Sequence, residues 1–418
     1  MNSLNLKLKK NKLMLYSLYS LGFFGMASMG IIFPTVTLYA LKLRANEFEI
    51  GLIQGLSSAI TVFTMVPFGY LSDSYGRKKF LIFAFIVALT SFISYSFVSS
   101  IPQLMIVRGF HGLFTSSFYP SAYAMAITLS SLENRGTILG LFSLFISFGF
   151  ALGNFFSGIL IEKFGFKITF YFCGFLAFIG LSIIFTKLNS YSESFRAKGD
   201  IKIKSELVRN KKLTFILFIP FIAFYSYGTT YAFFPLYGKS LGLTDSVIGI
   251  YLASYSIASS LMSIFSGKII DKFGSLIGIA NGLIIGAIAY LLLFFSNKGF
   301  LILVALIIAG ISNSLTYLSS QTFLTKEVSM SIMSSAVGIF SLFLHIGMTI
   351  GPIITGVMAS SFGLPFGFLL CSLLMLIALF GIGILSSVKP FSCIKTRALM
   401  PLCLINLALI FYAIIRTS

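Results

Sequence analysis

The sequence predicts an all-α polytopic membrane protein in which two six-helix bundles are related by an internal repeat. Hydrophobic residues make up 57% of the 418 residues, whereas charged residues make up only 10%. Twelve apolar stretches are each long enough to cross the roughly 30 Å of hydrocarbon in a bilayer. The two halves of the chain also match at one fixed separation. This composition excludes a soluble protein of two or three domains.

The separation between the two copies is 198 residues. It pairs Gly338 with Gly140, together with the phenylalanine and serine residues that follow each of them. The register extends well beyond that segment. Further pairs at the same separation are Gly249 with Gly51, Gly267 with Gly69, Asp271 with Asp73, Gly274 with Gly76, Gly347 with Gly149, Gly351 with Gly153, Gly363 with Gly165 and Cys371 with Cys173. Chance resemblance between glycine-rich helices does not produce one register over this distance, so we interpret the pattern as a parallel duplication.

The predicted spans fall into two groups of six around a polar break. In the first group they are 13–41, 50–71, 80–99, 101–129, 137–160 and 168–187. In the second group they are 213–238, 246–266, 276–295, 300–325, 334–358 and 365–387. The chain is thereby divided into an N-terminal bundle (1–187), a basic cytoplasmic linker (188–212), a C-terminal bundle (213–387) and a basic, then apolar, tail (388–418).

The cations predict the orientation in the membrane. The net charge is +19, yet its distribution indicates topology rather than nucleic-acid binding. With the N-terminus inside, most of the 30 Lys and Arg residues lie on the cytoplasmic side; those outside are Lys42, Arg44, Lys163, Lys167, Lys239 and Lys298. The basic start runs directly into a span too long for a signal core, so we expect no cleaved signal peptide. The prediction is a multi-pass plasma-membrane protein with a cytoplasmic N-terminus.

Two segments outside the spans keep alternative interpretations. The linker carries eight cations between Lys187 and Lys212, which suits contact with anionic headgroups and equally suits a solvated tether. The apolar run 399–415 contains Pro401 and Asn406, and both a thirteenth span and an interfacial helix fit it. The four cysteines show no metal-ligand spacing, so we infer neither a disulfide nor a metal site.

A short polar loop between the second and third spans carries the clearest motif. It contains Gly69, Leu71, Asp73, Gly76, Arg77 and Lys78, and its counterpart in the second half keeps Gly267, Asp271 and Gly274 but lacks the arginine. This loop resembles the signature loop of the major facilitator superfamily, and the resemblance extends over the twelve-span body. It implies that the two bundles rock about a central site in alternating access.

The two aspartates of these loops, Asp73 and Asp271, are predicted to act as conformational latches. The glycines allow a tight turn, and an aspartate at the end of one helix can face the positive N-terminal end of another. Asp73 would then contact the start of the eleventh helix near Ser334, and Asp271 the start of the fifth helix near Thr137. An anchoring role on the cytoplasmic side explains Arg77 and Lys78 equally well, but it does not explain two aspartates in register.

A glycine series marks the fifth and eleventh helices. Gly338, Gly347, Gly351 and Pro352 fit a spacing that the superfamily associates with exporters and antiporters, although there it belongs to the fifth helix. Here the fifth helix has Gly140, Gly149 and Gly153, with Asn154 at the proline position, which weakens the inference. Close helix packing, with a bend at Pro352, is the alternative explanation.

Few ionisable side chains lie well inside the predicted spans: Arg108, His111 and His345. Arg108 and His111 resemble the superfamily's Arg-x-x-Gln-Gly element, with histidine in place of glutamine, and the resemblance implies proton handling or recognition of substrate charge. A snorkelling arginine and packing histidines are the alternatives. A coupling proton is therefore a candidate partner, besides the bilayer and a small-molecule substrate.

Polar and aromatic residues mark the spans that line the central cavity in this fold. The candidates for substrate contact are Tyr119, Tyr227, Tyr231, Asn313, Tyr317 and Gln321. Hydroxyl and amide groups with aromatic faces suit a neutral, anionic or amphipathic organic solute, although hydrogen bonds between helices would also employ them. The absence of buried acids in the spans argues against strongly cationic drugs.

These observations predict a secondary transporter of a small organic solute, with export of an amphipathic compound slightly preferred. The alternatives are uptake of a sugar or organic anion, and a non-transporting membrane sensor on the same fold. Gly238-Lys239-Ser240 resembles part of a phosphate-binding loop, but Phe233 replaces its first glycine, so we expect no use of ATP. We expect no cofactor, no metal, no nucleic-acid partner and no catalytic residues.

Overall fold

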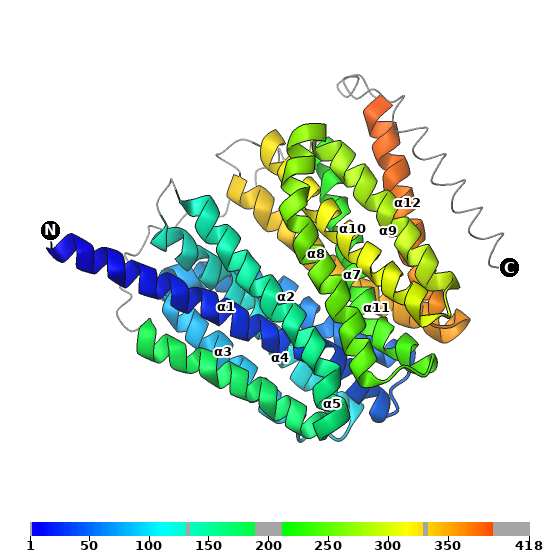
Figure 1. Cartoon of the computed structure of the whole chain (residues 1–418), viewed down its shortest axis with the longest axis horizontal. Helices are drawn as coiled ribbons and strands as arrows, with labels where there is room; N and C mark the ends of the chain where they lie inside the picture. The colour runs from blue at the N-terminus through cyan, green and yellow to red at the C-terminus, as the bar shows by residue number, and fades with distance from the viewer. Residues whose placement is uncertain (1, 131–133, 189–210, 329–332, 388–418) are drawn as a thin grey trace.

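The computed structural model is helical throughout the residues it describes, which are 2–130, 134–188, 211–328 and 333–387. Figure 1 shows two groups of helices lying side by side, one blue to green and the other green to orange. The first group contains α1 (Asn2–Lys42), α2 (Glu47–Tyr75), α3 (Arg77–Tyr95), α4 (Ile101–Leu129) and α5 (Arg135–Lys187). The second contains α7 (Lys211–Ser240), α8 (Asp245–Phe273), α9 (Ser275–Phe295), α10 (Gly299–Glu327), α11 (Met333–Phe362) and α12 (Pro365–Ser387). The two predicted bundles are thus confirmed.

The lengths and composition of these helices suit a bilayer. Ten helices of the described part are long and apolar enough to cross a membrane. They do not include α4, which carries Arg108 and His111 and many serines and tyrosines. Large apolar side chains are exposed on the outside of both bundles, including Phe63, Phe300 and Phe380, each more than 70% exposed. In a membrane these side chains contact lipid.

The fifth and sixth predicted helices are both present and meet at a sharp kink. The structure joins 137–160 and 168–187 into the single element α5, which bends at Gly165 where φ is 76°. With ψ at 171° as well, Gly165 is not helical, and two helices meet at a kink there; glycine accepts this backbone conformation without a Cβ clash. The repeat-related Gly363 has φ 101° and likewise separates α11 from α12. Helices are therefore present at all twelve predicted positions, although two of them share one label and α4 is not among the ten apolar candidates for a span.

The tight turns of the signature loops also depend on glycine. Gly76 lies between α2 and α3 with φ 109°, and Gly274 lies between α8 and α9 with φ 90°. A side chain at either position would be strained, because L-residues rarely adopt such angles. At the other end of α2, the Asn46 side chain accepts a hydrogen bond from the Glu49 backbone, and the Glu49 carboxylate accepts one from Asn46. This capping box fixes where α2 begins.

The bundles touch mainly at one end of the molecule. We call the side at which α1 begins the near side, and the side at which α1 ends and α2 begins the far side. On the far side, a Cβ on Gly51 would overlap the backbone of Pro352, and a Cβ on Gly158 would overlap the backbone of Asp245. Towards the near side, Gly140, Gly267 and Gly338 have no such neighbour within 4 Å. The far side is closed by backbone contact, whereas these near-side glycines face open space.

The far-side contacts obey the 198-residue repeat. Gly51 of α2 packs on α11 at Pro352, and the repeat-related Gly249 of α8 packs on α5 at Asn154. The pair formed by Gly356 and Glu47 is likewise matched by the pair formed by Gly158 and Asp245. We call these two contact regions the α2–α11 seam and the α5–α8 seam. Their correspondence shows that the duplication extends from the sequence to the contacts between the bundles.

The segments whose roles were predicted at the ends of the bundles lie outside the described residues. These segments are most of the linker (188–212) and the tail (388–418), including the apolar run 399–415.

Candidate functional site

Arg108 of α4 is fully buried inside the first bundle. Its Nη2 donates a hydrogen bond of 2.7 Å to Oε1 of Gln54 on α2, and Gln54 in turn donates to the Phe33 carbonyl at 3.0 Å and to the Thr37 hydroxyl at 2.7 Å. The guanidinium carbon lies 4.7 Å from the centroid of the Phe33 ring, which is a cation–π contact. Nε and Nη1 of Arg108 have no hydrogen-bond partner. A permanent charge with two free donors is thus kept inside the bundle rather than at its surface.

His111 lies one helical turn further along α4 and is also fully buried. Its Nδ1 is 3.5 Å from the Tyr95 hydroxyl, and its ring packs edge-on against Phe92 at 4.9 Å. Nε2 has no partner. Because these two neighbours come from α3, His111 ties α4 to α3, and its other ring nitrogen is buried without a partner.

Phe33 links the arginine to a cluster of aromatic rings between the bundles. Besides its contact with Arg108, the ring lies 5.9 Å from Tyr231 of α7 and 6.1 Å from Phe150 of α5. Tyr231 packs on Tyr227 with centroids 4.6 Å apart, and Phe150 lies 5.4 Å from Tyr231. The ring of Phe33 therefore separates the buried cation from the interface between the bundles.

A buried hydrogen-bond network crosses the same interface. The Asn154 amide of α5 donates to the Ser256 hydroxyl of α8 at 3.1 Å, and the hydroxyls of Ser256 and Tyr231 are 2.6 Å apart. Asn154 Oδ1 and the hydroxyl of nearby Tyr255 have no partner in the described structure. Asn154 occupies the position where the exporter pattern has proline, and here its side chain connects the two bundles.

Tyr119 and Tyr123 of α4 approach the second bundle nearer to the centre. Their rings lie 6.2 Å apart, and Tyr119 is close enough to Tyr227 and Tyr317 for electrostatic interaction between the hydroxyls. Tyr317 of α10 packs on Phe224 of α7 at 5.5 Å. Four of the predicted substrate residues, Tyr119, Tyr227, Tyr231 and Tyr317, are therefore brought together from three helices.

The other predicted candidates lie apart from this group. Asn313 of α10 is buried and donates to the Ala223 carbonyl of α7 at 3.3 Å, which is a contact between helices of one bundle. Gln321 is half-buried near the end of α10. His345 of α11 is 9% exposed, and its Nδ1 has no partner. We name the tyrosines that meet between the bundles, together with three neighbouring phenylalanines, the tyrosine cluster: Tyr119, Tyr123, Tyr227, Tyr231, Tyr317, Phe33, Phe150 and Phe224.

The signature loops lie at the open, near side. Asp73 is 57% exposed and accepts from Arg77 at 2.9 Å, and Arg77 also donates to the Ala124 carbonyl of α4 at 3.0 Å and to the Thr128 hydroxyl. Gly69 has only Pro120 as a distant neighbour. In this state the aspartate is thus engaged within its own bundle, while Lys78 lies at the start of α3 and Asp271 is exposed at the end of α8.

The glycine series serves close packing over part of its length. A Cβ on Gly149 or Gly153 would overlap the α1 backbone at Phe23 or Ala27. A Cβ on Gly347 or Gly351 would overlap the α7 backbone in the same way, at the residues Phe221 and Tyr225. The outlying members, Gly140 and Gly338, have open space around them in this state.

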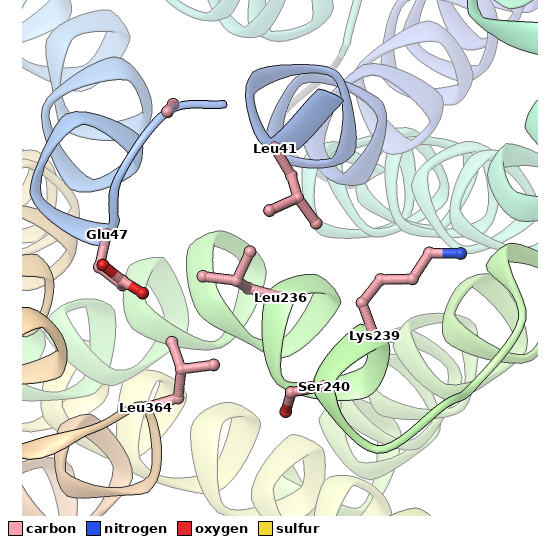
Figure 2. Close-up of a pocket in the computed structure, with 7 residues that line it drawn as sticks. Leu41, Glu47, Leu236, Lys239, Ser240 and Leu364 are labelled. Atoms are coloured by element: carbon pink, nitrogen blue, oxygen red, sulfur yellow. The ribbon is translucent and has the colours of Figure 1, made fainter. Parts of the chain in front are cut away.

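A pocket of about 310 Å³ lies at the far side between the bundles. Figure 2 shows the Glu47 carboxylate and the side chains of Leu41 and Leu236 around its centre, while the ammonium group of Lys239 points away. Its remaining lining residues are Ala45, Ser240 and Leu364. The pocket lies at the end of the molecule away from the tyrosine cluster, where the two bundles meet.

The sequence does not mark Phe33, Gln54 or Phe150 as functional residues, and Asn154 stands out in it only as a departure from a motif. Gln54 carries a detectable signal, because a carboxamide within a predicted span needs a buried partner. The contacts of the phenylalanines have no signal in the sequence, since the chain contains 48 phenylalanines.

Comparisons with known proteins find membrane transporters both by sequence and by fold. The family model of the Major Facilitator Superfamily matches residues 18–244 and 216–392, one match for each bundle. The MFS-type transporter MJ1560 of Methanocaldococcus jannaschii is 30% identical over 366 residues, which cover 86% of this chain and 93% of that protein. The multi-drug resistance efflux pump PmrA of Streptococcus pneumoniae is 24% identical over 81% of this chain and 87% of the pump.

Solved structures share the fold at low sequence identity. A bacterial homolog of the human lysosomal transporter Spinster, in an inward-facing and occupied conformation, has a TM-score of 0.77 and 17% identity, covering 89% of this chain and 96% of the other. The nucleoside transporter NupG has a TM-score of 0.72 and 16% identity, covering 89% and 99%. With a family match in both halves and two bundles related by the repeat, the chain belongs to the major facilitator superfamily.

Proposed function

We propose that this transporter exports amphipathic organic compounds by alternating access. The observation that carries the proposal is the tyrosine cluster, in which aromatic faces and hydroxyls from α4, α7 and α10 meet between the bundles. Such a surface binds apolar rings by stacking and polar groups by hydrogen bonding. Acidic side chains are not among the described contacts of the cluster, so neutral or anionic compounds fit it better than strong cations.

Several relatives support export. PmrA is a multi-drug resistance efflux pump, and the Quinolone resistance protein NorA of Staphylococcus aureus is 29% identical over 161 residues, which cover 38% of this chain and 41% of NorA. The glycine series of α11 adds to this, because its spacing fits the exporter pattern. Uptake of a sugar or an organic anion is the second candidate. The unpaired donors of Arg108 favour it, because they would suit an anionic group.

The orientation follows from the cations. Arg77, Lys78 and Lys79 lie on the near side with the basic start of α1. The positive-inside rule then places the near side in the cytoplasm, so the described state is open inwards and closed outwards. A substrate would enter between the bundles from the cytoplasm or the inner leaflet, and rocking would release it outside. His111 and His345 are the candidate carriers of a coupling proton, each with one free ring nitrogen.

The export proposal is tested with a fluorescent quinolone in cells that lack their own pumps. Cells that carry this protein should lose preloaded quinolone faster than cells with an empty vector. Tyr227→Ala should slow that loss about tenfold, because it removes a ring and a hydroxyl from the cluster. Tyr171→Ala is the matched control, since Tyr171 is 41% exposed on the outside of the bundle. Accumulation of the compound instead of loss would support uptake and contradict export.

The aspartate latch makes a separate prediction. When the near side closes, Asp73 is expected to leave Arg77 and face the start of α11, where a carboxylate is favoured by the helix dipole. Asp73→Asn should therefore lower the rate of efflux roughly fivefold at unchanged protein level. Ser74→Ala is the control, because its hydroxyl is bonded only within α2, to the Tyr70 carbonyl. Equal rates for Asp73→Asn and the unmodified protein would refute the latch.

A further inference from the structure

One carboxylate crosses between the bundles on the far side. Glu162 of α5 lies just beyond the predicted span 137–160, and its Oε2 accepts a hydrogen bond of 3.0 Å from the backbone nitrogen of Ser246. Ser246 is in the first turn of α8, which begins at Asp245. The first backbone N–H groups of a helix have no partner within the helix and carry partial positive charge. Glu162 therefore satisfies one of these donors from the opposite bundle.

An ion pair next to this hydrogen bond removes an electrostatic repulsion that would otherwise weaken it. Asp245 is adjacent to Ser246, so its carboxylate would repel that of Glu162 if it were unpaired. The ammonium group of Lys239, at the end of α7, lies 2.7 Å from Asp245 and neutralises it. Lys239 is also close enough to interact with Glu162 itself. Three charged side chains from α5, α7 and α8 thus act together at one point of the α5–α8 seam.

The α2–α11 seam has no equivalent of the contact that Glu162 makes in the α5–α8 seam. There Gly356 and Glu47 correspond to Gly158 and Asp245 at the separation of 198 residues, and the backbones touch in the same way. The counterpart of Glu162 is Ser360 and that of Lys239 is Leu41, so neither charge is repeated. Glu47 and Leu41 border the far-side pocket, which Lys239 also lines (Figure 2). The two seams share their backbone contacts and differ in the carboxylate and its lysine.

We propose that Glu162 is a one-sided latch, which holds the far side closed by docking on the start of α8 while Lys239 neutralises Asp245. Opening the far side must break this contact, because α5 and α8 belong to different bundles. Loss of the carboxylate charge, by substitution or by acid on the far side, releases the latch and favours the open far side. The inference rests on alternating access but not on the direction of transport or on the substrate.

The experiment measures the opening of the far side without a substrate. Spin labels are attached to cysteines at Phe48 of α2 and Phe362 of α11, which are exposed and lie on the seam without the latch, in a background whose four native cysteines are replaced. Double electron–electron resonance then gives the populations of short and long label distances in detergent. Glu162→Gln should raise the ratio of long to short distances roughly three- to fivefold at pH 7.5, as expected for one exposed contact between a carboxylate and a helix terminus.

Two controls assign the effect to the latch. Lys163→Gln alters the charge of the neighbouring residue on α5, an exposed side chain, and should leave the distances unchanged. The hydrogen bonds from Ser246 hold the pKa of Glu162 below its usual value, so only acid below that value protonates it. Acidification from pH 7.5 to about pH 3.5 should therefore shift the unmodified protein towards long distances and have little effect on Glu162→Gln. The charged groups that face Glu162 are Lys239 and Asp245, so Asp245→Asn must keep the acid response if Glu162 is the group that titrates.

Each possible result of this experiment either supports the Glu162 latch or overturns it. Unchanged distances in Glu162→Gln, or an equal shift in Lys163→Gln, would overturn it. If Glu162→Gln does not fold, the acid response of the unmodified protein and of Asp245→Asn decides alone, and its absence overturns the latch. A positive result in a protein that exports no quinolone would leave the latch standing and reject the proposed function.

Discussion

Replacing Gly158 by valine should abolish transport by holding the far side open. Any Cβ at this position overlaps the backbone carbonyl of Asp245, and no rotamer change can move a backbone atom away. Overpacking of this kind costs about 3 kcal/mol, which shifts the equilibrium between the closed and open far side roughly a hundredfold. A transporter confined to one state does not cycle. Label distances across the far side and the rate of efflux measure the two consequences.

The internal repeat provides a second variant, Gly356→Val, and the glycine series of α5 provides a control, Gly140→Val. Gly356→Val should act in the same way, because its Cβ would meet the backbone of Glu47 and Phe48 in the other seam. Gly140→Val adds the same side chain to α5 where no atom lies within 4 Å, so it should leave the far-side distances unchanged. If Gly158→Val still shows a closed far side, the backbone contacts do not determine closure.

Replacing Arg108 by methionine should slow transport strongly without loss of thermal stability. Arg108 is fully buried, lacks an acidic partner among the described residues and leaves two nitrogens unpaired. Apolar replacement of a poorly compensated buried charge is often neutral or stabilising, whereas Gln54 loses one hydrogen bond. The melting temperature in detergent should therefore stay within about 2 °C of the original or rise. Efflux should fall roughly 10- to 100-fold, the value of one hydrogen bond to a charged group.

The conservative variant separates charge from geometry. Arg108→Lys keeps the positive charge but lacks the planar group that contacts both Phe33 and Gln54, so we expect partial activity. Gln54→Leu should reduce the melting temperature more than Arg108→Met does, because it leaves the arginine without its acceptor and the Phe33 and Thr37 oxygens without their donor. Full transport by Arg108→Met would show that the arginine has only a structural role.

The fold was predictable because its signals are periodic and numerous. Twelve apolar stretches and one fixed separation define two bundles, and the backbone contacts of the two seams follow that register. The breaks at Gly165 and Gly363 were predicted, because both glycines lie between predicted spans at the separation of 198 residues. Their positive φ angles were not predicted, since glycines with positive and negative φ look the same in a sequence.

The candidate site was predictable only in part. Tyr119, Tyr227, Tyr231 and Tyr317 do meet between the bundles, and their contact with a substrate stays a prediction. The packing of Phe33 and Phe150 against Tyr231 depends on the three-dimensional structure. The partner of Asp73 depends on conformation: the side on which it lies is open here, so its proposed contact with α11 belongs to the other state. Glu162 was placed in a loop region, and only the position of α8 gives its carboxylate a specific partner.

The far side closes where glycines let one main chain rest on another, with few side chains in between. Surfaces of this kind can part and rejoin without waiting for rotamers to reorganise, and little bound water must be stripped from them. The energy barrier of the transport cycle should then be set by the few polar links that span the seams, above all the Asn154 amide. Substitution of a single hydrogen-bonding residue in a seam would then change the turnover rate of this carrier, whereas the glycines that form the backbone contacts must be kept.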